Sequence, residues 1–154
     1  MGGLCLNMLI RKAQPEDAYE LSELFTELVG EPSDIEEMKK QLQFVDTQPN
    51  YYVAVACSEN EVVGTAMGIV CVDLVGNCAP FLLIENVVVS SKYQKLGIGK
   101  KLMTELENFA IQHRCNFILL ASSHERKEAH HFYESLGYDD KKKGYFKQLY
   151  PTRI

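Results

Sequence analysis

The chain has 154 residues, a length that suits one domain with a sizeable core, and its formal net charge is −5. This acidic balance argues against nucleic acid as the main partner, because nucleic-acid-binding domains usually carry a basic patch. No stretch of about 18 apolar residues is present, so no membrane span is expected. The five cysteines are odd in number and irregularly spaced, which argues against a disulfide framework or a zinc site. We therefore predict a reducing, cytoplasmic location and no bound metal.

Apolar periodicity predicts strands and helices from residue 8 onward, after an N-terminal extension of residues 1–7. The expected strands cover residues 8–12, 51–57, 62–72, 82–89, 116–121 and 144–149. The expected helices cover residues 15–29, 33–45, 98–110 and 125–136. Pro15 marks the first helix start, and Ser33 with Glu36 forms a capping-box pattern at the second. Gly64 and Gly68 weaken the third strand or mark a bulge in it.

The order of these elements predicts the fold class. The helix after Gly97 connects two strands, and such a crossover requires at least one parallel strand pair. The earlier strands follow one another closely enough for antiparallel hairpins. We therefore expect a single α/β domain over residues 8–150, with a mixed, mostly antiparallel central sheet and helices on both faces.

The stretch YQKLGIGKKLM, residues 93–103, places two glycines at the start of an expected helix. Glycine is unfavourable in a helix, so Gly97 and Gly99 suggest that a ligand approaches the backbone there. Unpaired amides at the helix start and nearby lysines favour an anionic, phosphate-bearing ligand. The alternative is a tight turn with packing glycines and solvated lysines. Neither a P-loop nor a dinucleotide motif fits, because Lys101 and Leu102 replace the Ser or Thr and the glycine that those motifs need.

Three blocks of the sequence resemble the GCN5-related N-acetyltransferase family. Residues 94–99, QKLGIG, are similar to its Q/R-x-x-G-x-G/A motif, and residues 85–89 are similar to its cofactor strand. Residues 129–138, AHHFYESLGY, resemble its A-x-x-F-Y-E-x-x-G-F segment. The spacing of the blocks and the element order agree along almost the whole chain. The resemblance implies a transferase that uses acetyl-CoA as co-substrate.

The resemblance also implies where acetyl-CoA binds. The pyrophosphate would be held by the glycine loop and helix start, namely Gln94, Lys95, Leu96, Gly97, Ile98, Gly99 and Lys100. The pantetheine would insert between two splayed strands, with Val87, Val88 and Val89 facing residues 117–121 and with backbone groups of Val87 and Val89 pairing with it. Arg126 and Ala129 would complete the cofactor site. Arg126 stands where many members have Asn, and it either meets a CoA phosphate or is solvated.

Acetyl transfer to an amine needs a base, donors for the tetrahedral oxyanion and an acid for the leaving thiolate. Glu85 is the candidate base, because it lies in an otherwise apolar strand and shares a strand face with Val87, two residues on. Apolar surroundings suit a carboxylate that accepts a proton near neutral pH. Glu85 could instead anchor a cationic substrate. By resemblance, Tyr133 protonates the thiolate and the Val87 amide binds the oxyanion, and the alternative for Tyr133 is core packing.

We expect an N-acetyltransferase that acts on a primary amine of a small molecule, such as a polyamine, an amino sugar or an aminoglycoside-like compound. The acidic balance of the chain and Glu85 favour such a cationic acceptor. Two alternatives remain open, an enzyme that acetylates protein lysines or N-termini and a non-catalytic acyl-CoA sensor. The resemblance also implies a possible homodimer.

Overall fold

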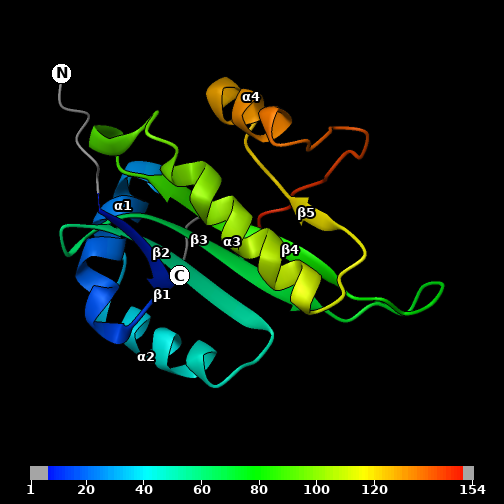
Figure 1. The fold of residues 1–154 in the computed structure, drawn as a ribbon, viewed down its shortest axis with the longest axis horizontal. Helices are drawn as coiled ribbons and strands as arrows, with labels where there is room; N and C mark the ends of the chain where they lie inside the picture. Colours follow the sequence, from blue (N-terminus) through cyan, green and yellow to red (C-terminus); the bar gives the residue numbers. More distant parts are fainter. Residues whose placement is uncertain (1–6, 151–154) are drawn as a thin grey trace. The chain divides into compact units, whose positions relative to one another are not determined.

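A five-stranded mixed sheet forms the centre of residues 7–120 in the computed structural model (Figure 1). The strands lie in chain order, as β1 (Met8–Lys12), β2 (Tyr51–Ser58), β3 (Glu61–Cys71), β4 (Phe81–Val89) and β5 (Ile118–Leu120). The first four strands pair antiparallel, and β4 pairs with β5 in parallel. The predicted mixed, mostly antiparallel sheet is confirmed.

The structure describes residues 7–150, so the predicted extension lies outside the described residues except for Asn7. The chain divides after Leu120 into two compact units, which are described separately. The second unit contains one helix, α4 (Lys127–Ser135). Among the described residues, no helix has both the length and the apolar character needed to cross a membrane.

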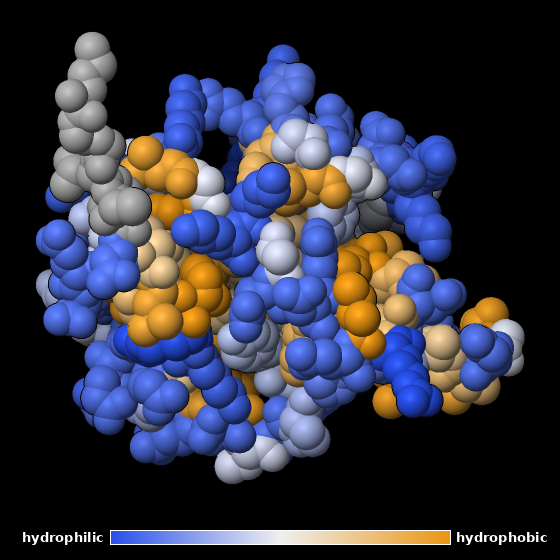
Figure 2. All heavy atoms as spheres, in the orientation of Figure 1, coloured by the Kyte–Doolittle hydropathy of each residue, from blue (hydrophilic) through white to orange (hydrophobic). Residues whose placement is uncertain are grey.

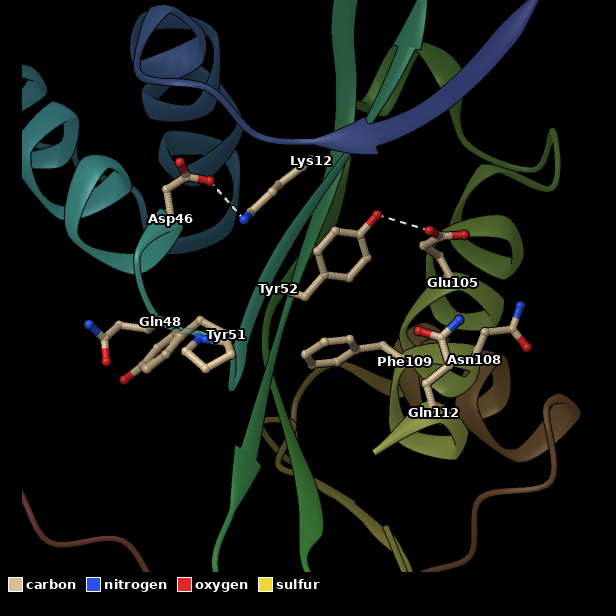
Figure 3. A pocket seen from close by; sticks show the side chains of 10 residues that line it. Lys12, Asp46, Gln48, Tyr51, Tyr52, Glu105, Asn108, Phe109 and Gln112 are labelled. Carbon is tan, nitrogen blue, oxygen red and sulfur yellow. Dashed lines mark hydrogen bonds and ion pairs between the residues drawn. The ribbon is translucent and has the colours of Figure 1, made fainter. Parts of the chain in front are cut away.

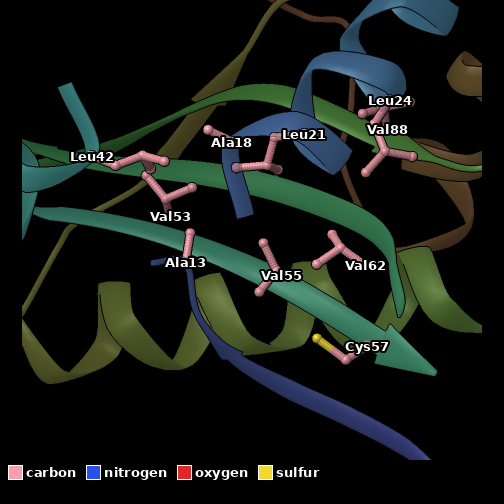
Figure 4. Close-up of a cluster of buried hydrophobic side chains, with 10 residues drawn as sticks. All are labelled: Ala13, Ala18, Leu21, Leu24, Leu42, Val53, Val55, Cys57, Val62 and Val88. Carbon is pink, nitrogen blue, oxygen red and sulfur yellow. The ribbon is translucent and has the colours of Figure 1, made fainter. Parts of the chain in front are cut away.

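Helices cover both faces of the sheet. On one face, the 3-10 turn η1 (Pro15–Asp17) leads into α1 (Ala18–Val29), and α2 (Ile35–Asp46) follows. Their apolar sides pack on alternate residues of β2 in one buried cluster (Figure 4). This cluster consists of Ala13, Ala18, Leu21, Leu24, Leu42, Val53, Val55, Cys57, Val62 and Val88. We call this side of the sheet the α1/α2 face.

The other face of the sheet carries α3 (Ile98–Gln112), and two glycines of β3 let this helix approach closely. A Cβ on Gly64 would lie 3.2 Å from Leu102 Cδ1 and 3.3 Å from the Val88 carbonyl oxygen. A Cβ on Gly68 would lie 3.2 Å from Leu106 Cδ2. Both glycines therefore provide room for helix packing, which is a reason for glycine inside a strand.

A partly buried ion pair between Arg11 and Asp17 fixes the turn between β1 and η1. Asp17 is 7% exposed and accepts hydrogen bonds from both terminal nitrogens of Arg11, at 2.7 and 2.8 Å, and from the Gln14 amide at 2.7 Å. Burial alone would raise the pKa of Asp17, but the Arg11 and Gln14 hydrogen bonds and the Arg11 charge outweigh it and lower the pKa. The folded state therefore favours the ionised carboxylate.

Several predicted boundaries shift. The predicted capping box is wrong by one residue: Asp34 caps α2 by accepting from the Glu37 amide at 3.0 Å, while the Ser33 amide donates to Ser22 Oγ. The strand predicted at residues 116–121 shortens to β5, and the helix predicted at 125–136 shortens to α4. The strand predicted at 144–149 is absent. Its aromatic residues favour strands, but propensity needs a paired neighbour, and these residues form no regular element.

The loop between β3 and β4 projects from the sheet and exposes apolar side chains (Figure 2). Val72, Leu74 and Val75 are 85%, 84% and 79% exposed, respectively. The core of residues 7–120 is therefore built without these three side chains.

Candidate functional site

The edge of β4 that faces β5 is only partly paired. Residues Leu82 to Ile84 oppose Ile118 to Leu120, and β5 ends at Leu120. Within residues 7–120, no strand pairs with residues 85–89 on this side. The expectation that Val87, Val88 and Val89 face residues 117–121 across the gap between the strands is wrong, because residues 118–120 pair with the earlier residues 82–84 of β4. The later part of β4 is left as an open edge.

The backbone groups of Val87 and Val89 point into this open edge. The Ser90 amide donates to the Val63 carbonyl across the β3–β4 ladder, at 2.8 Å. Backbone groups alternate in direction along a strand, so those of Val88 also point toward β3. Those of Val87 and Val89 consequently point away from β3 and are available to a ligand that extends the sheet.

A β-bulge separates Glu85 from Val87. Met67 opposes Glu85 and Thr65 opposes Val88, so two residues of β4 stand against the single residue Ala66. One of the two, Asn86, has a positive φ of 58°. Bulges are over-represented next to active sites, where they re-aim a side chain.

The bulge overturns the expectation that Glu85 and Val87 share a strand face. Directly opposed residues lie on the same face of a sheet, and Met67, opposite Glu85, packs against the cluster on the α1/α2 face. Val88 belongs to the same cluster. Glu85 and Val88 therefore share the α1/α2 face, and Val87 points to the other. Glu85 is also exposed, so the expected enclosure by apolar side chains is wrong.

Hydrogen bonds from three directions fix the loop between β4 and α3, which includes the 3-10 turn η2 (Ser91–Tyr93). The Ser91 amide donates to Glu27 of α1 at 3.0 Å. The Tyr93 hydroxyl donates to Glu61 of β3 at 3.4 Å, and Gln94 Nε2 donates to the Val89 carbonyl at 3.3 Å. The loop thus has a defined path although most of its side chains are exposed.

Two left-handed residues turn this loop into α3. Lys95 has φ of 62° and Gly97, the N-cap residue, has φ of 81°. A Cβ atom on Gly97 would have no neighbour within 4 Å, so there is space for a side chain at this position. Glycine is favoured here because of the left-handed backbone conformation. No side chain caps the helix, and the Lys101 amide makes the first bond, to the Gly97 carbonyl. The amides of Ile98, Gly99 and Lys100 therefore face outward, as in anion sites at helix starts.

One side chain at the start of α3 is buried in the core, whereas most side chains of the preceding loop are exposed. Ile98 is buried at 2% exposure and fixes the first turn of α3 in the core. Gln94, Lys95, Leu96 and Lys100 are exposed. The structure thus brings the predicted loop residues and residues 87–89 to the same end of β4, since the chain passes from one to the other through a single short turn.

The remaining predicted site residues lie in residues 121–150. Arg126 is the exposed N-cap of α4, and Ala129 lies in its first turn. Tyr133 is 7% exposed, and its ring centroid lies 5.3 Å from that of Phe132 and 6.1 Å from that of Tyr138. These aromatic contacts fit the core-packing alternative for Tyr133 and leave its chemical role a prediction.

A polar pocket at the other end of α3 was missed by the sequence predictions (Figure 3). It has a volume of about 470 Å³. Its walls come from the ends of β1 and α2, the loop between α2 and β2, the start of β2 and the last two turns of α3. The lining residues are Lys12, Asp46, Gln48, Pro49, Tyr51, Tyr52, Glu105, Asn108, Phe109 and Gln112. No local motif could have indicated it, because the residues are spread over a hundred positions of the chain.

Among residues 7–150, no group of three or more His, Cys, Asp or Glu side chains could hold a metal ion. The open edge of β4 presents the backbone groups of Val87 and Val89 next to the uncapped N-terminus of α3.

Both the sequence and the fold are similar to those of known acetyltransferases. A family model described as "Acetyltransferase (GNAT) family" matches residues 16–138. A protein of Agrobacterium tumefaciens str. C58 described as an acetyltransferase is 25% identical, with a TM-score of 0.84 over 92% of this chain and 99% of its own. Glucosamine-6-phosphate N-acetyltransferase from Arabidopsis thaliana is 24% identical, with a TM-score of 0.83 over 93% and 99%. An aminoglycoside acetyltransferase from an uncultured soil metagenomic sample is 24% identical, with a TM-score of 0.78 over 96% and 100%.

Proposed function

Because this chain belongs to the acetyltransferase (GNAT) family, and is thereby an N-acetyltransferase with acetyl-CoA as co-substrate, we propose that it acetylates the primary amine of a small cationic molecule. One observation carries the proposal. The open edge of β4, with the backbone groups of Val87 and Val89 directed into it, leads directly to the uncapped N-terminus of α3. The open strand edge suits the extended pantetheine chain with its amides, and the helix N-terminus suits the pyrophosphate at the end of that chain.

In this proposal the cofactor is bound mainly by backbone. The pantetheine lies along β4 as an added strand, and its amides pair with Val87 and Val89. The pyrophosphate meets the amides of Ile98, Gly99 and Lys100 and the positive end of the helix dipole. The side chains of Gln94, Lys95 and Arg126 add polar contacts at the rim, and Leu96 and Ala129 pack beside the cofactor. Val88, expected from the sequence in this site, lies with its side chain in the buried cluster and therefore supports β4 from the α1/α2 face.

The reaction is a direct transfer in a ternary complex. Glu85 accepts a proton from the substrate ammonium, directly or through water, and the neutral amine attacks the thioester carbonyl carbon. The resulting tetrahedral oxyanion accepts a hydrogen bond from the Val87 amide. Collapse breaks the carbon–sulfur bond, and the CoA thiolate takes a proton from the Tyr133 hydroxyl. The extra proton on the attacked nitrogen then passes through water to the Tyr133 oxygen, which yields the neutral amide and restores the phenol. The exposure of Glu85 supports a role toward an incoming substrate, as base or as anchor.

The acceptor class rests on charge and on structural likeness. The chain is acidic, and the exposed carboxylate of Glu85 attracts a cation to the open edge of β4. Two of the similar structures are enzymes named for glucosamine 6-phosphate and for aminoglycosides. Amino sugars and aminoglycosides are therefore the first acceptors to test, with a lysine-containing peptide as the comparison.

The test is steady-state kinetics of CoA thiol release with glucosamine, kanamycin, spermidine and the peptide. For Glu85→Gln we expect kcat to fall by about 100-fold or more if Glu85 is the base. A rise in KM for the amine at constant kcat would identify an anchor instead. Glu107→Gln, which also removes one carboxylate but lies on α3, is the matched control and should leave both constants unchanged.

Tyr133→Phe is the second variant of this experiment. Loss of the hydroxyl should lower kcat by about tenfold or more while leaving acetyl-CoA affinity unchanged. If Glu85→Gln and Tyr133→Phe both turn over like the unaltered protein, the catalytic assignment is wrong. Turnover of the peptide alone, with none of the small amines, would contradict the proposed acceptor class.

A further inference from the structure

The polar pocket at the C-terminal end of α3 is separate from the acetyl-transfer site. A helix rises about 1.5 Å per residue, so Glu105 to Gln112 lie about 12–22 Å along α3 from Gly97. The pocket also lies beside β1 and β2, whereas the open edge belongs to β4. A volume of about 470 Å³ is within the range of pockets that take small molecules.

Two aromatic rings form a corner inside this pocket. The ring centroids of Tyr52 and Phe109 lie 5.4 Å apart at an angle of 43° (Figure 3). Phe109 is in turn supported by His113, whose ring centroid is 4.2 Å away. The two tilted rings present faces to a ligand, and such faces attract both the C–H side of a sugar ring and an ammonium group.

One carboxylate in the pocket, Glu105, is not balanced by a cation of the pocket's own lining. Lys101, four residues earlier on α3, lines an adjoining cavity together with Glu105. The Lys12 and Asp46 side chains neutralise each other at 2.7 Å on the opposite wall. Glu105 accepts a hydrogen bond from the Tyr52 hydroxyl at 2.9 Å, and among residues 7–150 no basic side chain forms an ion pair with it. Burial and Glu105 raise the pKa of Tyr52 to about 12, so the phenol stays neutral at physiological pH. The pocket therefore carries a formal charge of about −1, located at Glu105.

The other polar groups of the pocket are neutral carboxamides. Gln48, Asn108 and Gln112 each offer a carbonyl acceptor and an NH₂ donor. Hydroxyl groups, which both donate and accept, match carboxamides better than an anion or an apolar ligand does. Figure 3 shows these amides arranged around the space in front of the aromatic corner, with Gln48 on one side and Asn108 and Gln112 on the other.

We propose that this pocket binds a small polyhydroxylated amine, such as an amino sugar, with its ammonium at Glu105 and its hydroxyls at the carboxamides. The site is a binding site in addition to the acetyl-transfer site, and it does not depend on the acceptor proposed above. Because Glu105 belongs to α3, the bound amine contacts the helix whose other end is the cofactor loop.

The test is an NMR titration with glucosamine, in the absence of acetyl-CoA, that follows the side-chain NH₂ signals of Asn108 and Gln112. These signals should shift at millimolar glucosamine. Glucose has the same ring with a hydroxyl in place of the amine, and it should bind at least about tenfold more weakly, because it lacks the charge-assisted bond to Glu105. Equal binding of glucose would overturn the assignment of an amine.

Variants separate this pocket from the acetyl-transfer site. Glu105→Gln should weaken the glucosamine-dependent shifts at least about tenfold, whereas Glu107→Gln, the matched loss of a carboxylate from α3, and Glu85→Gln should not. Asn108 is exposed, so Asn108→Ala keeps the fold and should weaken binding by about threefold or more. Absence of shifts at Asn108 and Gln112, or shifts that both Glu105→Gln and Asn108→Ala leave unchanged, would overturn the proposal.

Discussion

The two ends of α3 present two kinds of binding surface. At Gly97 the surface is backbone: left-handed residues, an uncapped helix start and the adjoining open edge of β4. At Glu105 to Gln112 the surface consists of side chains from β1, α2, β2, α3 and the loop between α2 and β2. Recognition by backbone depends on the conformation of the chain, and recognition by side chains depends on their identity. Substitutions should therefore act differently at the two ends.

Gly97→Val should have the largest effect. A β-branched residue is a conformational outlier at the φ of 81° found here, so the loop must change its path and redirect the amides of α3. We expect acetyl-CoA affinity to fall about 100- to 1,000-fold, or about 3–4 kcal/mol, by isothermal titration calorimetry. Ser91→Ala, a control at an exposed side chain of the same loop, should bind normally. Normal binding by Gly97→Val would show that the backbone path does not matter.

Asp17→Asn should destabilise the fold by about 2–3 kcal/mol at pH 7, because it leaves Arg11 without its charged partner. β1 supplies Lys12 to the polar pocket, so glucosamine binding should weaken more than acetyl-CoA binding. Chemical denaturation measures the stability.

The ion pair between Arg11 and Asp17 also makes the free energy of unfolding depend on pH. The pKa of Asp17 is lower in the folded state than its ordinary value of 3.8, so its contribution is complete above about pH 4 and is lost as the pH falls through the folded-state pKa. The difference in unfolding free energy between the unaltered protein and Asp17→Asn should therefore shrink below about pH 4. A constant difference from pH 7 to pH 3 would contradict this.

Gly64→Ala and Gly68→Ala should differ although both glycines face α3. At Gly64 one close neighbour of the added Cβ is the Val88 carbonyl, which is backbone and belongs to the open strand. At Gly68 the neighbours are the ends of leucine side chains, which can move. We expect a loss of about 1–2 kcal/mol with weaker acetyl-CoA binding for Gly64→Ala, and less than about 1 kcal/mol with normal binding for Gly68→Ala. The measurements are denaturation and calorimetry, and equal behaviour of the two variants would refute this distinction.

Lys95→Gly should have the smallest effect. Glycine adopts the left-handed conformation of Lys95 without strain, which stabilises the folded state. Glycine also gives the unfolded chain more conformational freedom, and this offsets most of the stabilisation. Stability should change by less than about 1 kcal/mol, and acetyl-CoA affinity by less than about threefold, since the amide stays in place. A larger loss of affinity would mean that the lysine charge binds the phosphates. Calorimetry at two salt concentrations separates the charge from the backbone.

The sequence predicted the elements that carry a local signal. Helix starts at Pro15 and after Gly97 and the apolar periodicity of residues 18–29 identify elements that the structure contains. The strand expected at 144–149 was wrong because strand propensity says nothing about whether a partner is present. The cap of α2 was wrong by one residue because Ser33 is held by Ser22 of α1, a contact that sequence spacing does not reveal.

The candidate site could be predicted only in part, for similar reasons. The glycine loop was found because two glycines at a helix start are unusual. The face of Glu85 was wrong because the bulge at Asn86 breaks the alternation of β4, and Asn at a positive φ leaves little trace in a sequence. The polar pocket could not be predicted, because its aromatic corner joins Tyr52 and Phe109, which only the packing of α3 on β2 brings together.

Backbone amide NMR of the complex with acetyl-CoA tests the central claim most directly. The amides of Val87, Val89, Ile98, Gly99 and Lys100 should show the largest shift changes and slowed hydrogen exchange, while the side-chain amides of Asn108 and Gln112 should stay unchanged. This result would establish backbone recognition at the β4 edge and the α3 N-terminus. Binding of acetyl-CoA with changes confined to the Asn108 end of α3, and none at residues 87–100, would contradict the account.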